Sequence, residues 1–460
     1  FKMAANKFPL NKDGNLANPD VRRAAGFNNF PIYSKYRGEF HANILPQAVL
    51  EGRPYPIRSV LSLGASIITS WPQSDIWEKT LAALDFLVCI DRQWTKDMEY
   101  ADIVLPATTY YEIQSYMVYD SVFKIREKVI EPVGEARNDF LIMADLANRL
   151  GYGHLYPQSE DEILESVLKG SGYTVDDVRA AGGSVQVETQ MMQYKKWEKG
   201  LLRLDGQPGF DTPSGKFEIA SSILEEHGYD ALPIYTEPGE SPQSQPELAK
   251  RYPLVFNSGS RTNVDLHTLH HSVPQLQQER PVPTVMMNTA DARERGIENG
   301  DYVYIESKRG RVGMYAQVTD AIVKGAVEAS GMGGGALGSD AWRNANANRL
   351  TDLSRYDPIS GFPVYKALLC EVVKVEEGDK QDLSGSWEYN VDNSIEEDQV
   401  MQRIYLDHNA TTPIASGVQQ AMVKYMEHYG NPSSIYAAGK EAHVAVENAR
   451  RALAILINCT

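Results

Sequence analysis

The 460-residue chain has few cysteines, no long apolar run and no excess of positive charge. Its three cysteines, Cys89, Cys370 and Cys459, lie far apart, so the sequence predicts neither a disulfide framework nor closely spaced thiolates that would ligate a metal or an iron–sulfur cluster. No stretch approaches the roughly 20 apolar residues that span a membrane, so we expect a water-soluble chain. The formal net charge of -16 repels phosphate backbones and excludes nucleic acid as the expected partner.

The start of the chain has neither an initiator methionine nor the basic, apolar and small-residue order of a signal peptide. We therefore interpret the sequence as a piece of a longer protein. The compartment, cytoplasmic or periplasmic, stays open because an address upstream of Phe1 is not visible.

The pattern between residues 57 and 91 predicts an α/β domain. An apolar run at 57–63 ends in the turn Gly64-Ala65-Ser66, a helix follows at 74–84, and a second apolar run at 86–90 ends at Asp91. A strand–helix–strand order of this length favours parallel strands, and such sheets bind ligands at their carboxyl ends. We therefore expect a doubly wound parallel sheet with a ligand site at the Gly64 turn and the Asp91 loop.

The remainder of this first domain, residues 1–245, contains a helix at 138–150 that closes the sheet and a weaker pattern at 157–217 that we interpret as a lid or insertion. Residues 236–253 are rich in Pro, Ser, Gln and Glu, which is typical of a linker that runs across a surface. A domain boundary is expected near Pro246.

A mostly β domain is predicted for residues 246–375. Val303 and Ile305 alternate with polar residues, and four apolar side chains recur at every second position from Val312 to Val318. Closely spaced strands with repeated glycine turns indicate a small closed barrel. An acidic linker at 376–402 is followed by a truncated third unit at 403–460.

Several segments together resemble the dimethyl sulfoxide reductase family of molybdopterin oxidoreductases. In chain order they are Gly64-Ala65-Ser66, Tyr100 to Pro106, Thr212 to Lys216, Ser258-Gly259-Ser260-Arg261, Asp291 to Asp301, and Asp357-Pro358 with Ser360-Gly361. Their order and spacing make the match specific. The resemblance covers about residues 1–375 and corresponds to the later portion of the family, in which two domains enclose two pterin dinucleotides.

The resemblance implies cofactor contacts in both domains. Gly64 and Ala65 would let the backbone approach one dinucleotide, Ser66 stands where the family more often has Asn, and Asp91 would take the guanine or ribose hydrogen bonds. The implied contacts of the second domain are Ser258, Gly259, Ser260 and Arg261 to phosphate or pterin, His267, Thr268, His271 and Ser272 to the pterin, and Asn348 and Lys366 by the same logic.

The implied cofactor is a pair of molybdopterin guanine dinucleotides with molybdenum or tungsten, acting on a small-molecule substrate. In the family, the metal ligand and a 4Fe-4S motif come from an earlier portion that nothing here matches, so we assign no catalytic residue or metal ligand and expect this stretch alone to be inactive. The resemblance suggests a thiosulfate or polysulfide type of reductase. It also implies an iron–sulfur electron-transfer subunit and a membrane anchor subunit as partners.

The tail resembles the start of a class V aminotransferase-like cysteine desulfurase, in Tyr405 to Pro413 and Tyr429 to Ser434. Such enzymes need a Lys for pyridoxal phosphate and a sulfur-accepting Cys, and both normally lie beyond this opening. The pair indicates either two neighbouring genes joined together or a bifunctional protein that supplies sulfur to the molybdoenzyme.

Three other interpretations compete with these. Asp265, His267, His270 and His271 have spacings compatible with zinc, although a structural histidine pair is the more common outcome. The glycine-rich stretch 331–338 lacks the Lys and Ser/Thr of a phosphate-binding loop, which favours a mobile loop. A non-catalytic fragment that only binds cofactor is the alternative to the enzyme.

Overall fold

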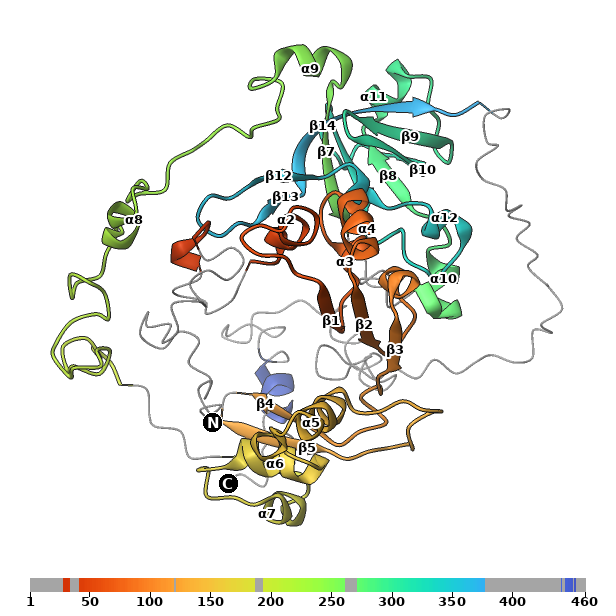
Figure 1. Cartoon of the computed structure of the whole chain (residues 1–460). Coiled ribbons are helices and arrows are strands. Elements are labelled where there is room, and N and C mark those ends of the chain that lie inside the picture. Colours follow the sequence, from red (N-terminus) through yellow and green to blue (C-terminus); the bar gives the residue numbers. More distant parts are fainter. Residues whose placement is uncertain are drawn as a thin grey trace. The chain divides into compact units, whose positions relative to one another are not determined.

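The computed structural model describes residues 28–33, 41–119, 121–186, 193–260, 271–376, 440, 443–449 and 451 (Figure 1). The chain divides into two units, Phe1–Ser386 and Trp387–Thr460, and the second contributes only the helical residues 440, 443–449 and 451 to this description. None of the helices in the described ranges is both long and apolar enough to cross a membrane. The segments predicted to form the acidic linker and the desulfurase motifs lie outside the described residues, except for residue 376.

A three-stranded parallel sheet with the order β1-β2-β3 forms the first region (Figure 1). Its strands and neighbouring helices are η2 (Ala42–Ile44), α2 (Leu45–Leu50), β1 (Ser59–Leu63), α3 (Ile67–Ser70), α4 (Ser74–Ala82), β2 (Phe86–Asp91), η3 (Lys96–Tyr100), β3 (Ile103–Pro106) and α5 (Asp139–Arg149). The predicted order of strand, helix and parallel strand is confirmed. The helix predicted at 138–150 is also present, with the Asn138 side chain capping its first turn.

Helices cover both faces of this sheet because its central strand is apolar on both sides. Leu87 and Cys89 of β2 pack with Trp77 and Leu81 of α4. On the opposite face Ile90 packs in a second cluster with Ala107 and, from α5, Ile142. This double burial fixes the strands, so that the loops after β1 and β2 meet at one edge.

A separate antiparallel sheet follows β3 in the chain, with the order β4-β5-β6. Its elements are β4 (Ser115–Tyr119), β5 (Val122–Arg126), η4 (Gly153–Leu155), α6 (Glu160–Leu168), α7 (Val175–Ala180) and β6 (Ser184–Gln186). Phe123, Leu164 and Val178 form its own core. Residues 157–186, which fall in the predicted lid or insertion, therefore pack onto the hairpin β4–β5 instead of standing apart as a lid.

The connecting stretch 236–253, predicted to run across a surface, is anchored in the barrel region. Glu240 is 2% exposed, and its carboxylate accepts hydrogen bonds from Arg309, at 2.9 Å to each guanidinium nitrogen, and from the backbone N–H of Leu369 at 3.0 Å. Lys308 adds an ion pair at 2.7 Å. Burial favours the neutral acid, but these donors outweigh it and lower the pKa of Glu240 to about 2. The low apolar content of residues 236–253 gave no sign that Glu240 would be buried and paired with Arg309 and Lys308.

The second region is a closed six-stranded barrel with the order β10-β8-β11-β7-β14-β9, drawn in green to blue in Figure 1. Its elements are α8 (Ser222–Glu226), which precedes it, α9 (Pro246–Arg251), β7 (Leu254–Ser260), α10 (Pro274–Glu279), β8 (Thr284–Met287), α11 (Thr289–Glu294), β9 (Tyr302–Ser307), β10 (Gly310–Val318), β11 (Ala326–Ser330), α12 (Asp340–Arg343), η6 (Ala347–Arg349), β12 (Asp352–Tyr356), β13 (Pro363–Val364) and β14 (Lys366–Lys374). The predicted barrel is confirmed.

Alternation of apolar and polar residues builds the barrel core. Val303 and Ile305 of β9 and Val312 and Met314 of β10 are at most 2% exposed, and the two strands pair antiparallel across the Lys308-Arg309 turn. The every-second-residue pattern in the sequence therefore marks the inward side of the barrel.

The glycine-rich stretch 331–338 packs closely against its surroundings, unlike the mobile loop predicted for it. Gly331, Gly333 and Gly334 are buried. A Cβ added at Gly331 would lie 2.9 Å from the Cα of Gly259, so only glycine permits this approach of two backbones.

Candidate cofactor site

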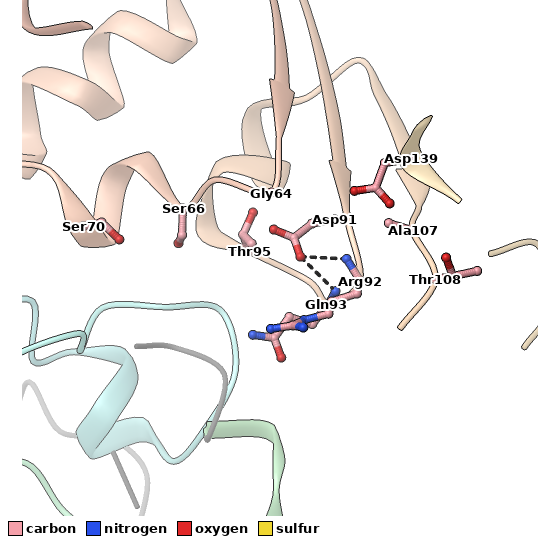
Figure 2. A pocket seen from close by; sticks show the side chains of 10 residues that line it. All are labelled: Gly64, Ser66, Ser70, Asp91, Arg92, Gln93, Thr95, Ala107, Thr108 and Asp139. Atoms are coloured by element: carbon pink, nitrogen blue, oxygen red, sulfur yellow. Dashed lines mark hydrogen bonds between the residues drawn. The ribbon is translucent and has the colours of Figure 1, made fainter. Parts of the chain in front are cut away.

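The first pocket lies at the carboxyl edge of the parallel sheet and has a volume of about 420 Å³. We call it the sheet pocket. Figure 2 shows its lining, which is Gly64, Ser66, Ser70, Asp91, Arg92, Gln93, Thr95, Ala107, Thr108 and Asp139. These residues come from the loops after β1, β2 and β3, from the end of α3 and from the start of α5. The pocket therefore forms where the sequence predicted a ligand site.

Asp91 is the central acid of the sheet pocket (Figure 2). Its Oδ1 accepts hydrogen bonds from the backbone N–H of Arg92 at 2.7 Å and of Gln93 at 3.4 Å. Partial burial raises the pKa of Asp91, and these two backbone bonds oppose the rise. The loop thus holds the carboxylate at the strand end, where it can accept hydrogen bonds from the N–H or O–H groups of a ligand.

A second acid, Asp97, holds the start of α3, the short helix that follows the Gly64 turn. Its carboxylate accepts from the backbone N–H of Ile67 at 2.6 Å and of Ile68 at 3.0 Å. The side chain is fully buried, and this burial raises its pKa to about 6 even though both hydrogen bonds favour the charged form. Asp97 fixes the helix that carries Ser66 and Ser70 at its two ends.

The second pocket lies between the end of α3 and one end of the barrel and has a volume of about 790 Å³. We call it the barrel pocket. Its lining is Ser70, Trp71, Ser258, Gly259, Gly331, Met332, Ala347, Asn348, Phe362, Pro363, Val364, Tyr365 and Lys366. Aromatic and aliphatic side chains dominate, with a few polar groups, which is the usual lining of a site for a flat organic ligand.

The structure brings together most of the predicted site residues that it describes. Gly64, Ser66 and Asp91 line the sheet pocket. The barrel pocket receives Ser258, Gly259, Asn348 and Lys366.

Three other predicted residues line neither the sheet pocket nor the barrel pocket. Ala65 packs against the core cluster of the sheet instead of lining either pocket. The buried His271 contacts Trp342 with ring centroids 4.5 Å apart and the ring planes tilted by 36°, and it lines a small adjoining pocket with Ser66. Ser272 donates to Gln93, a residue of the sheet pocket, at 3.1 Å. For Ser260 the structure describes only the strand backbone, and Arg261, His267 and Thr268 lie outside the described residues.

Asn348 has a contact that the sequence did not suggest. Besides lining the barrel pocket, its side-chain amide donates to the backbone oxygen of Thr69 in α3 at 2.7 Å. The Asn348 side chain, predicted to contact the pterin, therefore also makes a hydrogen bond to the α/β region.

Sequence reasoning missed several lining residues. Thr108 follows β3, and Asp139 begins α5. Parallel strands bind ligands at their carboxyl ends, so Thr108 could have been predicted in the same way as Asp91 if β3 had been recognised as a strand. Trp71, Phe362 and Tyr365 of the barrel pocket carry no local signal, because only the fold brings their segments together.

Metal-ligating groups do not converge in the parts of the chain that the structure describes. Within those ranges there is no cluster of three or more His, Cys, Asp or Glu side chains arranged to hold an ion. Cys89 and Cys370 are buried, and burial raises the pKa of Cys89 to about 11 and that of Cys370 further still. Such thiols stay protonated at neutral pH, whereas metal ligation needs the thiolate. Of the four residues weighed for zinc, only His271 is described.

The residues present fit a large polar cofactor. Gly64 (φ +57°) and Gly259 (φ +92°) adopt left-handed backbone conformations, and a Cβ added at either would meet nothing within 4 Å. Each pocket thus has one glycine where a ligand can approach the backbone closely. The polar groups of the sheet pocket suit a nucleotide, and the flat apolar walls of the barrel pocket suit a ring system.

Comparisons with known proteins agree with this geometry. Residues 15–149 match the model of the molybdopterin oxidoreductase family, and residues 254–369 match that of the molydopterin dinucleotide binding domain. This part of the chain belongs to the molybdopterin oxidoreductases. Residues 404–460 match the class-V aminotransferase model, and of these only residues 440, 443–449 and 451 are described.

Individual proteins of known activity are similar to a part of this chain. Acetylene hydratase of Syntrophotalea acetylenica is 27% identical, over 61% of this chain and 38% of its own length. A dimethyl sulfoxide/trimethylamine N-oxide reductase of Rhodobacter capsulatus is 31% identical, over 55% of this chain and 32% of its own. The chain thus spans well under half the length of these relatives.

A solved structure shares the fold. Acetylene hydratase from Pelobacter acetylenicus superposes with a TM-score of 0.67 at 23% identity, over 78% of this chain and 53% of that one. The mixed α/β architecture with its closed barrel is therefore a fold that this chain shares with that acetylene hydratase.

Proposed function

We propose that this chain is the cofactor-holding part of the catalytic subunit of a molybdenum or tungsten oxidoreductase that carries two molybdopterin guanine dinucleotides. One observation carries the proposal: two pockets of ligand size share the helix α3, since Ser70 lines both. Such an arrangement suits two large cofactors that converge on one metal. Because the chain spans a minor part of its relatives, the activity belongs to the longer protein.

The two pockets divide the work of binding. In the sheet pocket, Asp91 accepts from the guanine or ribose of one dinucleotide, while the exposed backbone at Gly64 faces its phosphates. In the barrel pocket, Asn348 and Ser258 address a pterin and Lys366 a phosphate. When bound, the metal-containing cofactor supplies two-electron redox chemistry; the residues described here bind and orient it.

The test is a cofactor analysis of the native, full-length protein, purified from a host that makes the cofactor. We expect molybdenum or tungsten by elemental mass spectrometry, a fluorescent pterin after oxidation, and about two equivalents of GMP per chain after acid hydrolysis. The absence of GMP and pterin from a folded protein would refute the proposal. A protein that releases GMP but lacks turnover would support the alternative of a non-catalytic cofactor binder.

For the substrate, we propose a reducible sulfur compound of the thiosulfate or polysulfide kind. The turnover of these compounds with reduced viologen tests this choice. Dimethyl sulfoxide and trimethylamine N-oxide are measured beside them as alternative substrates. An iron–sulfur electron-transfer subunit, with or without a membrane anchor subunit, is the partner we expect to copurify. A 4Fe-4S cluster is expected only in a longer chain.

The tail supports a second candidate function. Residues 404–460 match the class-V aminotransferase model. A complete desulfurase that begins with these residues would donate sulfur to the molybdenum site. Pyridoxal phosphate absorbance in the native protein, and its absence from a chain that ends at Thr460, would support that fusion. A native protein without this absorbance would contradict it.

A further inference from the structure

The helix α3 is the wall that the two pockets share. Ser66 at its start lines the sheet pocket, and Ser70 at its end lines both the sheet pocket and the barrel pocket. A displacement of this one short helix therefore alters both pockets at once.

Polar side chains from the barrel region hold the C-terminal end of this helix. A helix end leaves backbone oxygens without intrahelical partners, and α3 has only four residues. Three of these oxygens accept from barrel side chains: Ile68 from the amide of Asn346 at 2.9 Å, Thr69 from the amide of Asn348 at 2.7 Å, and Ser70 from the hydroxyl of Tyr365 at 3.2 Å.

The chain just beyond α3 is held in the same way. The backbone N–H of Gln73 donates to the hydroxyl of Thr351 at 3.1 Å, and the Gln73 side chain accepts from the backbone N–H of Leu353 at 3.3 Å. Gln73 has a left-handed backbone (φ 57°), which costs free energy for a non-glycine residue and needs support from its surroundings.

The three donors are well placed for this task. Asn346 is 5% exposed and Asn348 is 7% exposed. Burial raises the pKa of Tyr365 to about 12, so its hydroxyl keeps the proton that it donates at any physiological pH. Buried amide and hydroxyl donors make hydrogen bonds that water does not replace easily.

We infer that Asn346, Asn348 and Tyr365 are positioning residues: from the barrel region they set the place of α3 and thereby the shape of the sheet pocket. Asn346 lines neither the sheet pocket nor the barrel pocket, so its effect on the sheet pocket passes through Ile68. The inference rests on the proposed function only for the identity of the ligand. The hydrogen bonds that hold α3 are independent of that identity.

Two variants remove one donor each. Asn346→Asp keeps the oxygen that accepts from the backbone N–H of Asn348 at 3.0 Å and replaces the amide donor by a carboxylate oxygen, which repels the backbone oxygen of Ile68. Tyr365→Phe removes only the hydroxyl, and it is the milder change should Asn346→Asp fold poorly. Asn344→Asp, at an exposed position two residues away, and Tyr356→Phe, 43% exposed, are the matched controls.

Two readouts are taken on the full 460-residue chain. The first is amide hydrogen exchange of residues 64–70 without ligand. The second is the affinity for guanosine 5′-diphosphate by calorimetry, with exchange protection of 64–70 and 91–95 locating the bound nucleotide. We expect both variants to speed exchange in α3 and to weaken binding roughly three- to tenfold, the value of one lost hydrogen bond, while the controls match the parent.

The outcomes separate the two proposals. If exchange in α3 and nucleotide affinity equal those of the parent in both variants, the positioning role is refuted. If the nucleotide leaves 64–70 and 91–95 unprotected in the parent chain, but the variants still speed exchange in α3, the nucleotide assignment of the sheet pocket falls and the positioning role stands.

Discussion

The two pockets are built in opposite ways. The sheet pocket draws its lining mostly from loops that directly follow the parallel strands β1, β2 and β3, within residues 64–108. The barrel pocket draws its lining from segments near residues 70, 258, 331, 348 and 364, which only the closed barrel brings together. The sheet pocket therefore depends on local chain geometry, and the barrel pocket depends on long-range contacts.

The largest expected effect tests that dependence at Glu240, which joins the connecting stretch to β14, the strand of Lys366. Glu240→Gln removes the shorter of two ion pairs of the buried Arg309, whose other partner Asp352 lies at 3.6 Å, and also removes the ion pair to Lys308. We therefore expect the free energy of unfolding to fall by about 4 kcal/mol. Urea unfolding measures this change, and the exposed Glu247→Gln is the control. A stability equal to the parent's would show that the barrel does not need this ion pair.

The second prediction concerns Asp97 in the sheet region and is a pH dependence. Burial raises its folded pKa to about 6, above the value of about 3.9 expected in the unfolded chain. A raised carboxyl pKa stabilises the fold below pH ~4, and this contribution is lost as the pH rises through ~6. Asp97→Asn should remove up to about 3 kcal/mol of pH dependence between pH 4 and 6.

Urea unfolding at a series of pH values checks this slope, with the exposed Asp320→Asn as control. A slope in Asp97→Asn as steep as the parent's would assign the titration to another group.

The third prediction compares one glycine from each pocket. Gly331→Ala places a Cβ 2.9 Å from the Cα of Gly259, so two backbones must separate, and we expect a loss of about 2 kcal/mol. Gly64→Ala meets only the left-handed backbone penalty of about 1 kcal/mol, since nothing lies within 4 Å. Thermal unfolding of both variants measures the difference. Equal losses would mean that the barrel pocket is no more tightly packed than the sheet pocket.

The last prediction concerns ligand affinity alone. Asp91→Asn should weaken the binding of guanosine 5′-diphosphate about tenfold, because it replaces a charged acceptor at the strand end by a neutral one. The fold should be unchanged, because an amide oxygen still accepts from Arg92 and Gln93. Calorimetry gives the affinity. An affinity equal to that of the parent would show that the nucleotide does not bind at Asp91 in the sheet pocket.

The same contrast explains how far the sequence could be interpreted. Gly64, Ser66 and Asp91 were predicted together, because parallel strands end at a common edge and a strand-loop pattern is local. Ser258, Gly259, Asn348 and Lys366 were named through resemblance to a family, and only the structure shows that they share a pocket. The local composition predicted a surface linker around Glu240 and a mobile loop at 331–338, whereas Glu240 and several of these glycines are buried.

By itself, the sequence determined the order of strands and helices around the sheet pocket, the alternating core of the barrel, and the family that residues 15–149 and 254–369 match. Hydrophobic period and turn residues carry that information along the chain. The tertiary structure alone decided that Asn346, Asn348 and Tyr365 hold α3, about 280 residues or more earlier in the chain. Side-chain donors meet distant backbone oxygens only after folding, so no local pattern marks them.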